Sequence, residues 1–87
     1  MDIYFHIKYT DNEGFSIIGA AAVPRVGEIV TYHYQPTDPL KWTAEARDAN
    51  EKVADYRYEV CSVEHEFLFH DIGDMHHTIR VILERDI

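Results

Sequence analysis

Residues 56–69 read Tyr-Arg-Tyr-Glu-Val-Cys-Ser-Val-Glu-His-Glu-Phe-Leu-Phe, and their pattern predicts more about the fold than any other segment does. Large side chains occupy even positions up to Val60 and odd positions from Val63 to Phe69. Alternation with a period of two indicates a strand with one buried face. The change of parity requires one extra residue at Cys61–Ser62, which is a β-bulge. A long strand bent at a bulge is typical of a sheet that curls into a small barrel.

Three more strands are predicted in the first part of the chain. Residues 2–10 alternate, with Ile3, Phe5, Ile7 and Tyr9 on one face. The turn at residues 11–14 contains Asn and Gly, which tolerate positive φ, and we expect residues 15–23 to form the return strand of a hairpin. After Pro24 and Gly27, residues 29–34 form the third predicted strand.

Residues 37–53 have a different composition and predict a helical insert between the third and fourth strands. Thr37-Asp38-Pro39 is a typical helix start, with a capping side chain followed by proline. A stripe at helical spacing follows, made of Trp42, Ala46, Ala49 and Val53. We expect a short helix of about ten residues, anchored by Trp42.

The last strand alternates through Ile79, Val81 and Leu83 and closes a hairpin with residues 56–69. With the loop around Ile72-Gly73-Asp74, we expect Phe67 opposite Ile79, His65 opposite Val81 and Val63 opposite Leu83. On the outer face, this register places Glu66 opposite Arg80 and His70 opposite His76.

The composition predicts one domain over residues 1–87 and excludes several function classes. Sixteen acidic against eight basic residues give a net charge of −8, and the basic residues are scattered, so we expect no direct binding to nucleic acid or to anionic membranes. The single cysteine, the absence of a signal peptide and the lack of an apolar run of ~20 residues favour a cytoplasmic protein. A basic protein partner would complement the charge.

Three segments together resemble the short SH3-like β-barrel proteins of bacteria and their phages. They are the entry turn at residues 23–30 (Val-Pro-Arg-Val-Gly-Glu-Ile-Val), the kinked strand at 58–65 and the alternating strand at 78–84. The resemblance implies a small binding or adaptor module and brings no catalytic residue with it. The helical insert departs from the pattern. We therefore expect an all-β fold, either a five-stranded bent antiparallel sheet or an SH3-like barrel, with one short helix.

A histidine cluster near the last hairpin is a candidate metal site. Two imidazoles opposed on one face, with a carboxylate in the adjoining turn, could hold Zn²⁺ or Ni²⁺, and the candidate ligands are His70, His76, His77 and Asp74. The same histidines would gain charge below about pH 6.5 and could make the domain pH-responsive. The spacing matches no established zinc signature, so incidental surface histidines are the simpler interpretation, and no cofactor is predicted.

No catalytic constellation emerges from the sequence, and we expect a protein that is not an enzyme. Cys61 and His65 are four residues apart on a strand, roughly 13 Å, whereas a nucleophile and its base need about 3 Å. Glu64 and Glu66 could act as an acid/base pair only in a cleft, and a solvated strand face is the simpler interpretation.

The aromatic and acidic residues suggest a binding surface. Tyrosine and tryptophan next to carboxylates suit contact with a protein partner, and the candidates are Tyr4, Tyr32, Tyr34, Trp42, Glu59, Glu64 and Glu66. Tyrosines that close the ends of a barrel are the alternative. The leading hypothesis is a non-enzymatic module that binds a protein, with a phage-type inhibitor that imitates nucleic acid as its sharper version. A metal- or pH-responsive domain and a homo-oligomeric structural component are the alternatives, and a homodimer through exposed strand edges is compatible with each.

Overall fold

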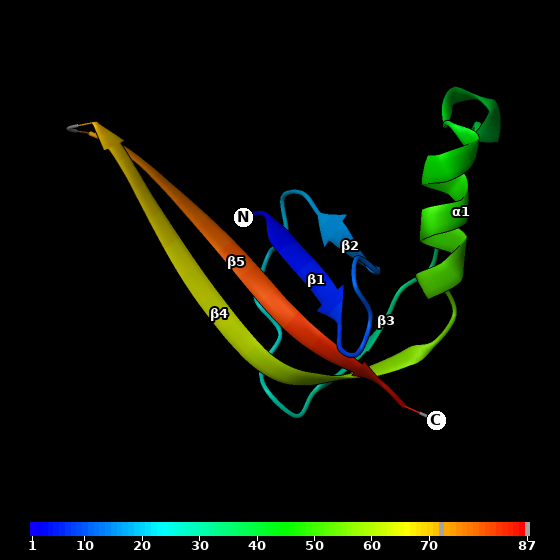
Figure 1. The fold of residues 1–87 in the computed structure, drawn as a ribbon, viewed down its shortest axis with the longest axis horizontal. Helices are drawn as coiled ribbons and strands as arrows, with labels where there is room; N and C mark the ends of the chain where they lie inside the picture. Colours follow the sequence, from blue (N-terminus) through cyan, green and yellow to red (C-terminus); the bar gives the residue numbers. More distant parts are fainter. Residues whose placement is uncertain (72, 87) are drawn as a thin grey trace.

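The protein is a curled half-barrel with one long hairpin that extends from it (Figure 1). A computed structural model describes residues 1–71 and 73–86. The elements in chain order are β1 (Ile3–Ile7), β2 (Gly14–Ile17), β3 (Ile29–Thr31), the short 3-10 helix η1 (Pro39–Lys41), α1 (Ala44–Val53), β4 (Arg57–Asp71) and β5 (Asp74–Arg85). The strands form one sheet in the order β2-β1-β5-β4-β3. The predicted β class with five strands and one short helix is confirmed.

The sheet is mixed, whereas the sequence predicted antiparallel pairing throughout. β1 runs parallel to β5, with Phe5 opposite Val81, and the other three pairs are antiparallel. β1 and β5 are the first and last strands, so no short hairpin sets their relative direction. The parallel direction of β1 relative to β5 therefore depends on the path of the whole chain, and local sequence patterns do not reveal it.

The predicted bulge in β4 is confirmed. Val60 lies opposite Leu83 and Ser62 lies opposite Ile82, which leaves Cys61 as the extra residue. The insertion keeps Val60 and Val63 on the same side of the sheet although their positions differ in parity. β4 bends as it passes from α1 to the hairpin (Figure 1).

The predicted register of the β4–β5 hairpin is wrong by two residues. His65 lies opposite Ile79, Glu64 rather than Glu66 lies opposite Arg80, and Phe67 lies opposite His77. The predicted register leaves Gly73 alone between paired strands, which is too tight for a hairpin. The observed pairing of Asp71 with Asp74 leaves a two-residue connection, and a second irregularity between Phe69 and Asp71 accommodates it.

That connection includes Gly73, whose φ of 83° lies in the left-handed region that favours glycine. Ile72, the other residue that we assigned to the loop, lies outside the described residues. A shift by two residues preserves the faces, so the predicted grouping of odd and even side chains holds.

The helical insert lies between β3 and β4 as expected, but it has two parts. The predicted start at Asp38-Pro39 begins η1, where the Asp38 carboxylate accepts a hydrogen bond from the Leu40 N–H. α1 starts later, where the Thr43 hydroxyl oxygen accepts from the Ala46 N–H at 3.1 Å. Of the predicted stripe, only Val53 is buried.

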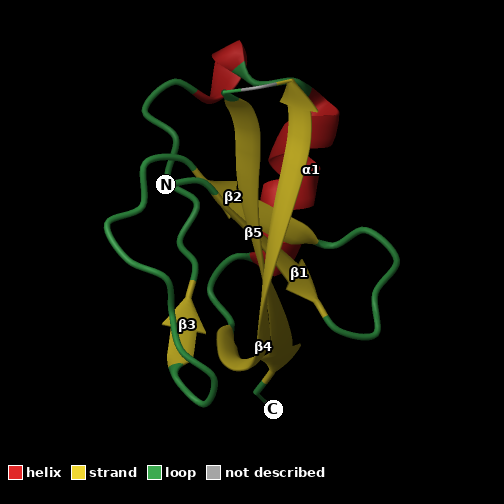
Figure 2. Ribbon diagram, turned by 90° about the vertical axis from the view of Figure 1, so that its left-hand side faces the viewer, coloured by secondary structure: helices red, strands yellow, loops and turns green. Residues whose placement is uncertain are grey.

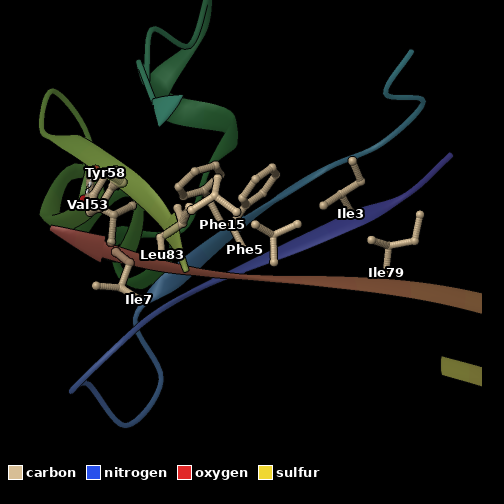
Figure 3. Close-up of a cluster of buried hydrophobic side chains, with 10 residues drawn as sticks. Ile3, Phe5, Ile7, Phe15, Val53, Tyr58, Ile79 and Leu83 are labelled. Atoms are coloured by element: carbon tan, nitrogen blue, oxygen red, sulfur yellow. Dashed lines mark hydrogen bonds between the residues drawn. The ribbon is translucent and has the colours of Figure 1, made fainter. Parts of the chain in front are cut away.

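The core lies where β1, β5 and the first part of β4 face the end of α1 (Figure 3). Phe5 and Phe15 stack with ring centroids 4.7 Å apart, and Tyr58 donates a hydrogen bond from its hydroxyl to the Val53 carbonyl. The buried residues are Ile3, Phe5, Ile7, Phe15, Val53, Ala54, Tyr58, Val60, Ile79, Val81 and Leu83. Tyr9 was expected on this face, but β1 ends at Ile7 and Tyr9 is exposed with a φ of 68°.

The hairpin continues far beyond this core. We call residues 64–71 and 73–78 the arm, and the remaining described residues the body. β4 and β5 run side by side to the end of the arm (Figure 2). At about 3.3 Å per residue, residues 64–71 span roughly 23 Å. All described arm residues are exposed except Thr78, which is partly buried. The expectation that Phe67 and Phe69 are buried is therefore wrong.

Candidate protein-binding surface

One face of the arm is apolar and continues the core-facing side of the sheet. We call His65, Phe67, Phe69, Met75 and His77 the inner face. Phe67 is paired with His77 and Phe69 with Met75, so these side chains share one side of the hairpin. Phe67, Phe69 and Met75 are 64%, 60% and 61% exposed. With 150–250 Å² per aromatic side chain, they present on the order of 300 Å² of apolar surface, a size that marks interaction sites.

The sequence contains a signal for an exposed apolar face on this hairpin. Phe67, Leu68 and Phe69 are three consecutive large apolar residues. In a strand, neighbouring side chains point to opposite faces, so one core can bury either Phe67 and Phe69 or Leu68, but not all three. Leu68 is 56% exposed on the opposite face, where it pairs with His76.

The opposite side of the sheet is acidic and collects four of the seven predicted binding residues. We call it the outer face. One row across the sheet runs from Tyr4 in β1 through Arg80 in β5 to Glu64 in β4. Glu66 follows along the arm opposite Thr78, and Glu59 lies on the same side opposite Glu84, beyond the bulge. Tyr4 is half exposed and all three glutamates are exposed.

The charge of the arm is almost all of one sign. From residue 58 to residue 79 the chain has no lysine or arginine, while the carboxylates in that span are Glu59, Glu64, Glu66, Asp71 and Asp74. Asp71 and Asp74 pair at the far end of the arm. The arm thus combines an apolar inner face with an acidic outer face and an acidic tip.

The other three predicted binding residues lie elsewhere. Tyr32 packs into the body, where its ring stacks on Phe15 at 4.1 Å and its hydroxyl donates to Asn50 Oδ1 at 2.6 Å. Tyr34 and Trp42 pack edge to face with ring centroids 5.6 Å apart. α1, which follows Trp42, lies at the opposite end of the long axis from the tip of the arm (Figure 1). A single surface with all seven residues does not exist.

Tyr32 serves the core rather than a binding surface, and its ionisation reflects this. Burial raises the pKa of its hydroxyl above the usual 10.0, and Tyr34 raises it further. The Tyr34 hydroxyl is itself buried and has no hydrogen-bond partner among the described residues. Tyrosines that close the ends of a barrel with their hydroxyls in water stay a prediction, and neither of these two hydroxyls reaches water in that way.

The predicted metal ligands are split between the two faces of the arm. His76 Nε2 lies 3.4 Å from Asp74 Oδ1, and the rings of His70 and His76 meet edge to face at 5.2 Å. His77 projects from the inner face instead, where its Nε2 lies 3.0 Å from Nδ1 of His65. Among the residues that the structure describes, no three histidine, cysteine or acidic side chains gather as a metal cluster.

Cys61 has the properties of a structural residue at the bulge. Desolvation is the main cause that raises the pKa of its thiol above the usual 9.0, and the nearby Glu84 carboxylate raises it further. The thiol donates to Glu84 Oε2 at 3.7 Å. It is therefore protonated at neutral pH, and a protonated thiol is a poor nucleophile.

A surface hollow of about 490 Å³ lies between the turn after β1 and α1. Its walls come from residues 9–14 and from Asp48, Ala49 and Lys52. Lys52 is 3.5 Å from Asp48, one helical turn away. None of the predicted site residues lines this hollow, so the hollow and the arm are separate features.

Comparison of the chain with protein-family models, curated proteins and solved structures found no match. The likeness to SH3-like barrel proteins therefore stays a prediction. Within the described part of the chain, none of the helices has the length and apolar character needed to cross a membrane.

Proposed function

We propose that the protein is a non-enzymatic protein-binding module and that the arm is its binding element. The observation that carries this proposal is the exposure of Phe67, Phe69 and Met75 on an arm outside the core. Exposed aromatic and methionine side chains are enriched at the centres of protein interfaces, where they supply most of the binding energy.

The chemistry of the arm defines the partner. Both faces are accessible, so the complementary shape is a groove in another protein that takes up the hairpin. The groove needs one apolar wall for the inner face and lysine or arginine on the other wall for Glu64 and Glu66. In the sharper version of the proposal, the carboxylates occupy a nucleic-acid-binding groove in place of phosphates. That version requires the charges of the outer face to carry most of the affinity.

The test begins with affinity capture from a lysate, followed by purification of the captured protein and titration calorimetry with it. Phe67→Ser/Phe69→Ser should weaken binding about 30-fold or more, because the loss of a single hot-spot residue already costs about 2 kcal/mol. The matched control is Ile18→Ser, because Ile18 is an exposed apolar residue of the body, and it should bind like the original protein. Equal affinity for the arm variant and the original protein would overturn the proposal.

Charge reversal separates the two versions. Glu64→Lys/Glu66→Lys should slow association and remove much of its salt dependence if the groove is basic. If this variant binds nearly as well as the original protein, the sharper version is wrong while the apolar inner face keeps its role.

Sedimentation experiments test whether a second copy of the protein, instead of a different protein, covers the inner face. If the protein forms a dimer that Phe67→Ser/Phe69→Ser dissociates, a second copy covers the inner face and the proposal of a different partner is wrong. The exposed edges of β2 and β3 could also pair between copies, and such a dimer would persist in the arm variant.

A further inference from the structure

Two histidines meet on the inner face at the base of the arm. His65 on β4 and His77 on β5 approach with 3.0 Å between Nδ1 of the first and Nε2 of the second. Their rings lie 5.2 Å apart and are inclined by 23°. Phe67 also stacks on His77, at 4.4 Å with an inclination of 11°. Phe67 and His65 thus both pack against the His77 ring.

The two nitrogens share one hydrogen bond in this arrangement, and that bond uses a single proton. Two imidazole nitrogens this close together can also serve as adjacent ligands of one metal ion. With metal–nitrogen bonds of about 2.1 Å at a right angle, adjacent ligand nitrogens are about 3.0 Å apart. Tetrahedral ligands with the same bonds are about 3.4 Å apart. The observed separation of 3.0 Å matches the right-angled geometry.

We propose that His65 and His77 form a two-histidine site that binds one divalent transition-metal ion per chain, of the Ni²⁺ or Cu²⁺ type. Such ions accept imidazole nitrogen in square-planar or octahedral geometry. The ion replaces the hydrogen bond between Nδ1 and Nε2: the donor ring loses its proton there and takes one up at its other nitrogen, so both rings bind as neutral imidazoles and no net proton is released. Water fills the remaining positions, since no third side-chain ligand gathers there among the described residues.

This site differs from the one that the sequence predicted. The predicted ligands His70 and His76 meet edge to face, and His76 directs Nε2 toward Asp74. His65, which was assigned to the core-facing stripe, becomes a ligand instead. The site needs no protein partner to form, and because His65 and His77 belong to the inner face, a partner that covers this face would also cover the site.

The test is titration calorimetry of the untagged protein with Ni²⁺, using Mg²⁺ as the hard-ion control. We expect one Ni²⁺ per chain and no heat from Mg²⁺. His65→Gln and His77→Gln should each weaken Ni²⁺ binding by at least about tenfold, because each removes one of the two protein ligands of the ion. His76→Gln is the matched control on the other face and should change the affinity by less than about twofold.

Three outcomes would overturn the site: no heat from Ni²⁺, equal affinity in all four proteins, or a loss confined to His76→Gln. All three histidines are exposed, so the variants should fold, and melting curves without metal check this. Ni²⁺ should also raise the melting temperature of the original protein but not that of His65→Gln, because the ion binds only the folded hairpin.

Discussion

β4 and β5 run through both the body and the arm. Only in the body does other structure cover their inner side. In the body, the sheet curls so that its inner-side residues pack against one another and against the end of α1, which buries Val60, Val81 and Leu83. In the arm, none of the described residues covers this side of the same strands, and Phe67 and Phe69 are exposed. Apolar alternation therefore identifies a face suited to burial. The surface that buries it can belong to the same chain, as in the body, or to another molecule.

The largest expected effect tests this division directly. Leu83→Ala should lower the free energy of unfolding by about 2–5 kcal/mol, because it opens a cavity at a fully buried position. Phe69→Ala, a larger deletion in the arm, should cost less than about 1 kcal/mol. Urea denaturation of both variants checks the contrast. Similar losses would mean that the arm contributes to the core in solution.

Alanine substitutions of one glycine in the body and one in the arm compare how closely the backbone is packed in the two regions. A Cβ atom at Gly14 would overlap the carbonyl oxygen of Phe5 in the neighbouring strand, so Gly14→Ala should cost about 3 kcal/mol. Gly73 is surrounded by open space, and Gly73→Ala should cost only about 1 kcal/mol for its left-handed conformation. Thermal melts followed by circular dichroism measure both. The reverse order would contradict the assigned β1–β2 register.

Two tyrosine hydroxyls in the body differ in their hydrogen bonding, and removing each of them should change stability in a different way. Tyr32→Phe should destabilise by about 1 kcal/mol because it removes the hydrogen bond to Asn50. Tyr34→Phe removes a buried hydroxyl without a partner and should be neutral or stabilising by up to about 1 kcal/mol. Chemical denaturation of both variants gives the difference. A destabilising Tyr34→Phe would show that its hydroxyl has a partner in solution.

The smallest effect is a loss of stability at alkaline pH. The raised pKa of Tyr32 means that the folded state holds this proton more tightly than the unfolded state does. Its contribution is complete below its usual pKa of 10.0 and declines as the pH rises through the higher folded value. Cys61 behaves in the same way above its usual 9.0. Melting temperatures between pH 8 and 11 should therefore fall less in Tyr32→Phe/Cys61→Ser than in the original protein. Parallel curves would contradict both shifts.

The local features of this protein could be predicted from residue patterns alone. The parity change places the bulge at Cys61–Ser62, the helical spacing places one short helix between β3 and β4, and alternation identifies the strands. The predicted cap at Asp38 begins η1 instead of α1, and β2 and β3 end earlier than predicted, at Ile17 and Thr31. These features depend on residues that are close in sequence, because the pleat, the helical turn and the caps are all local geometries.

Features that depend on distant segments became visible only in the complete fold. The direction of β1 beside β5, the two-residue connection that shifts the hairpin register, and the approach of His65 to His77 all require the complete chain path. Burial is the clearest case. The same apolar alternation runs through Val63 and Phe67, and only the position of the covering layer determines which part is core and which part is exposed arm. A strand pattern encodes two faces, whereas burial also needs a second surface to cover one of them.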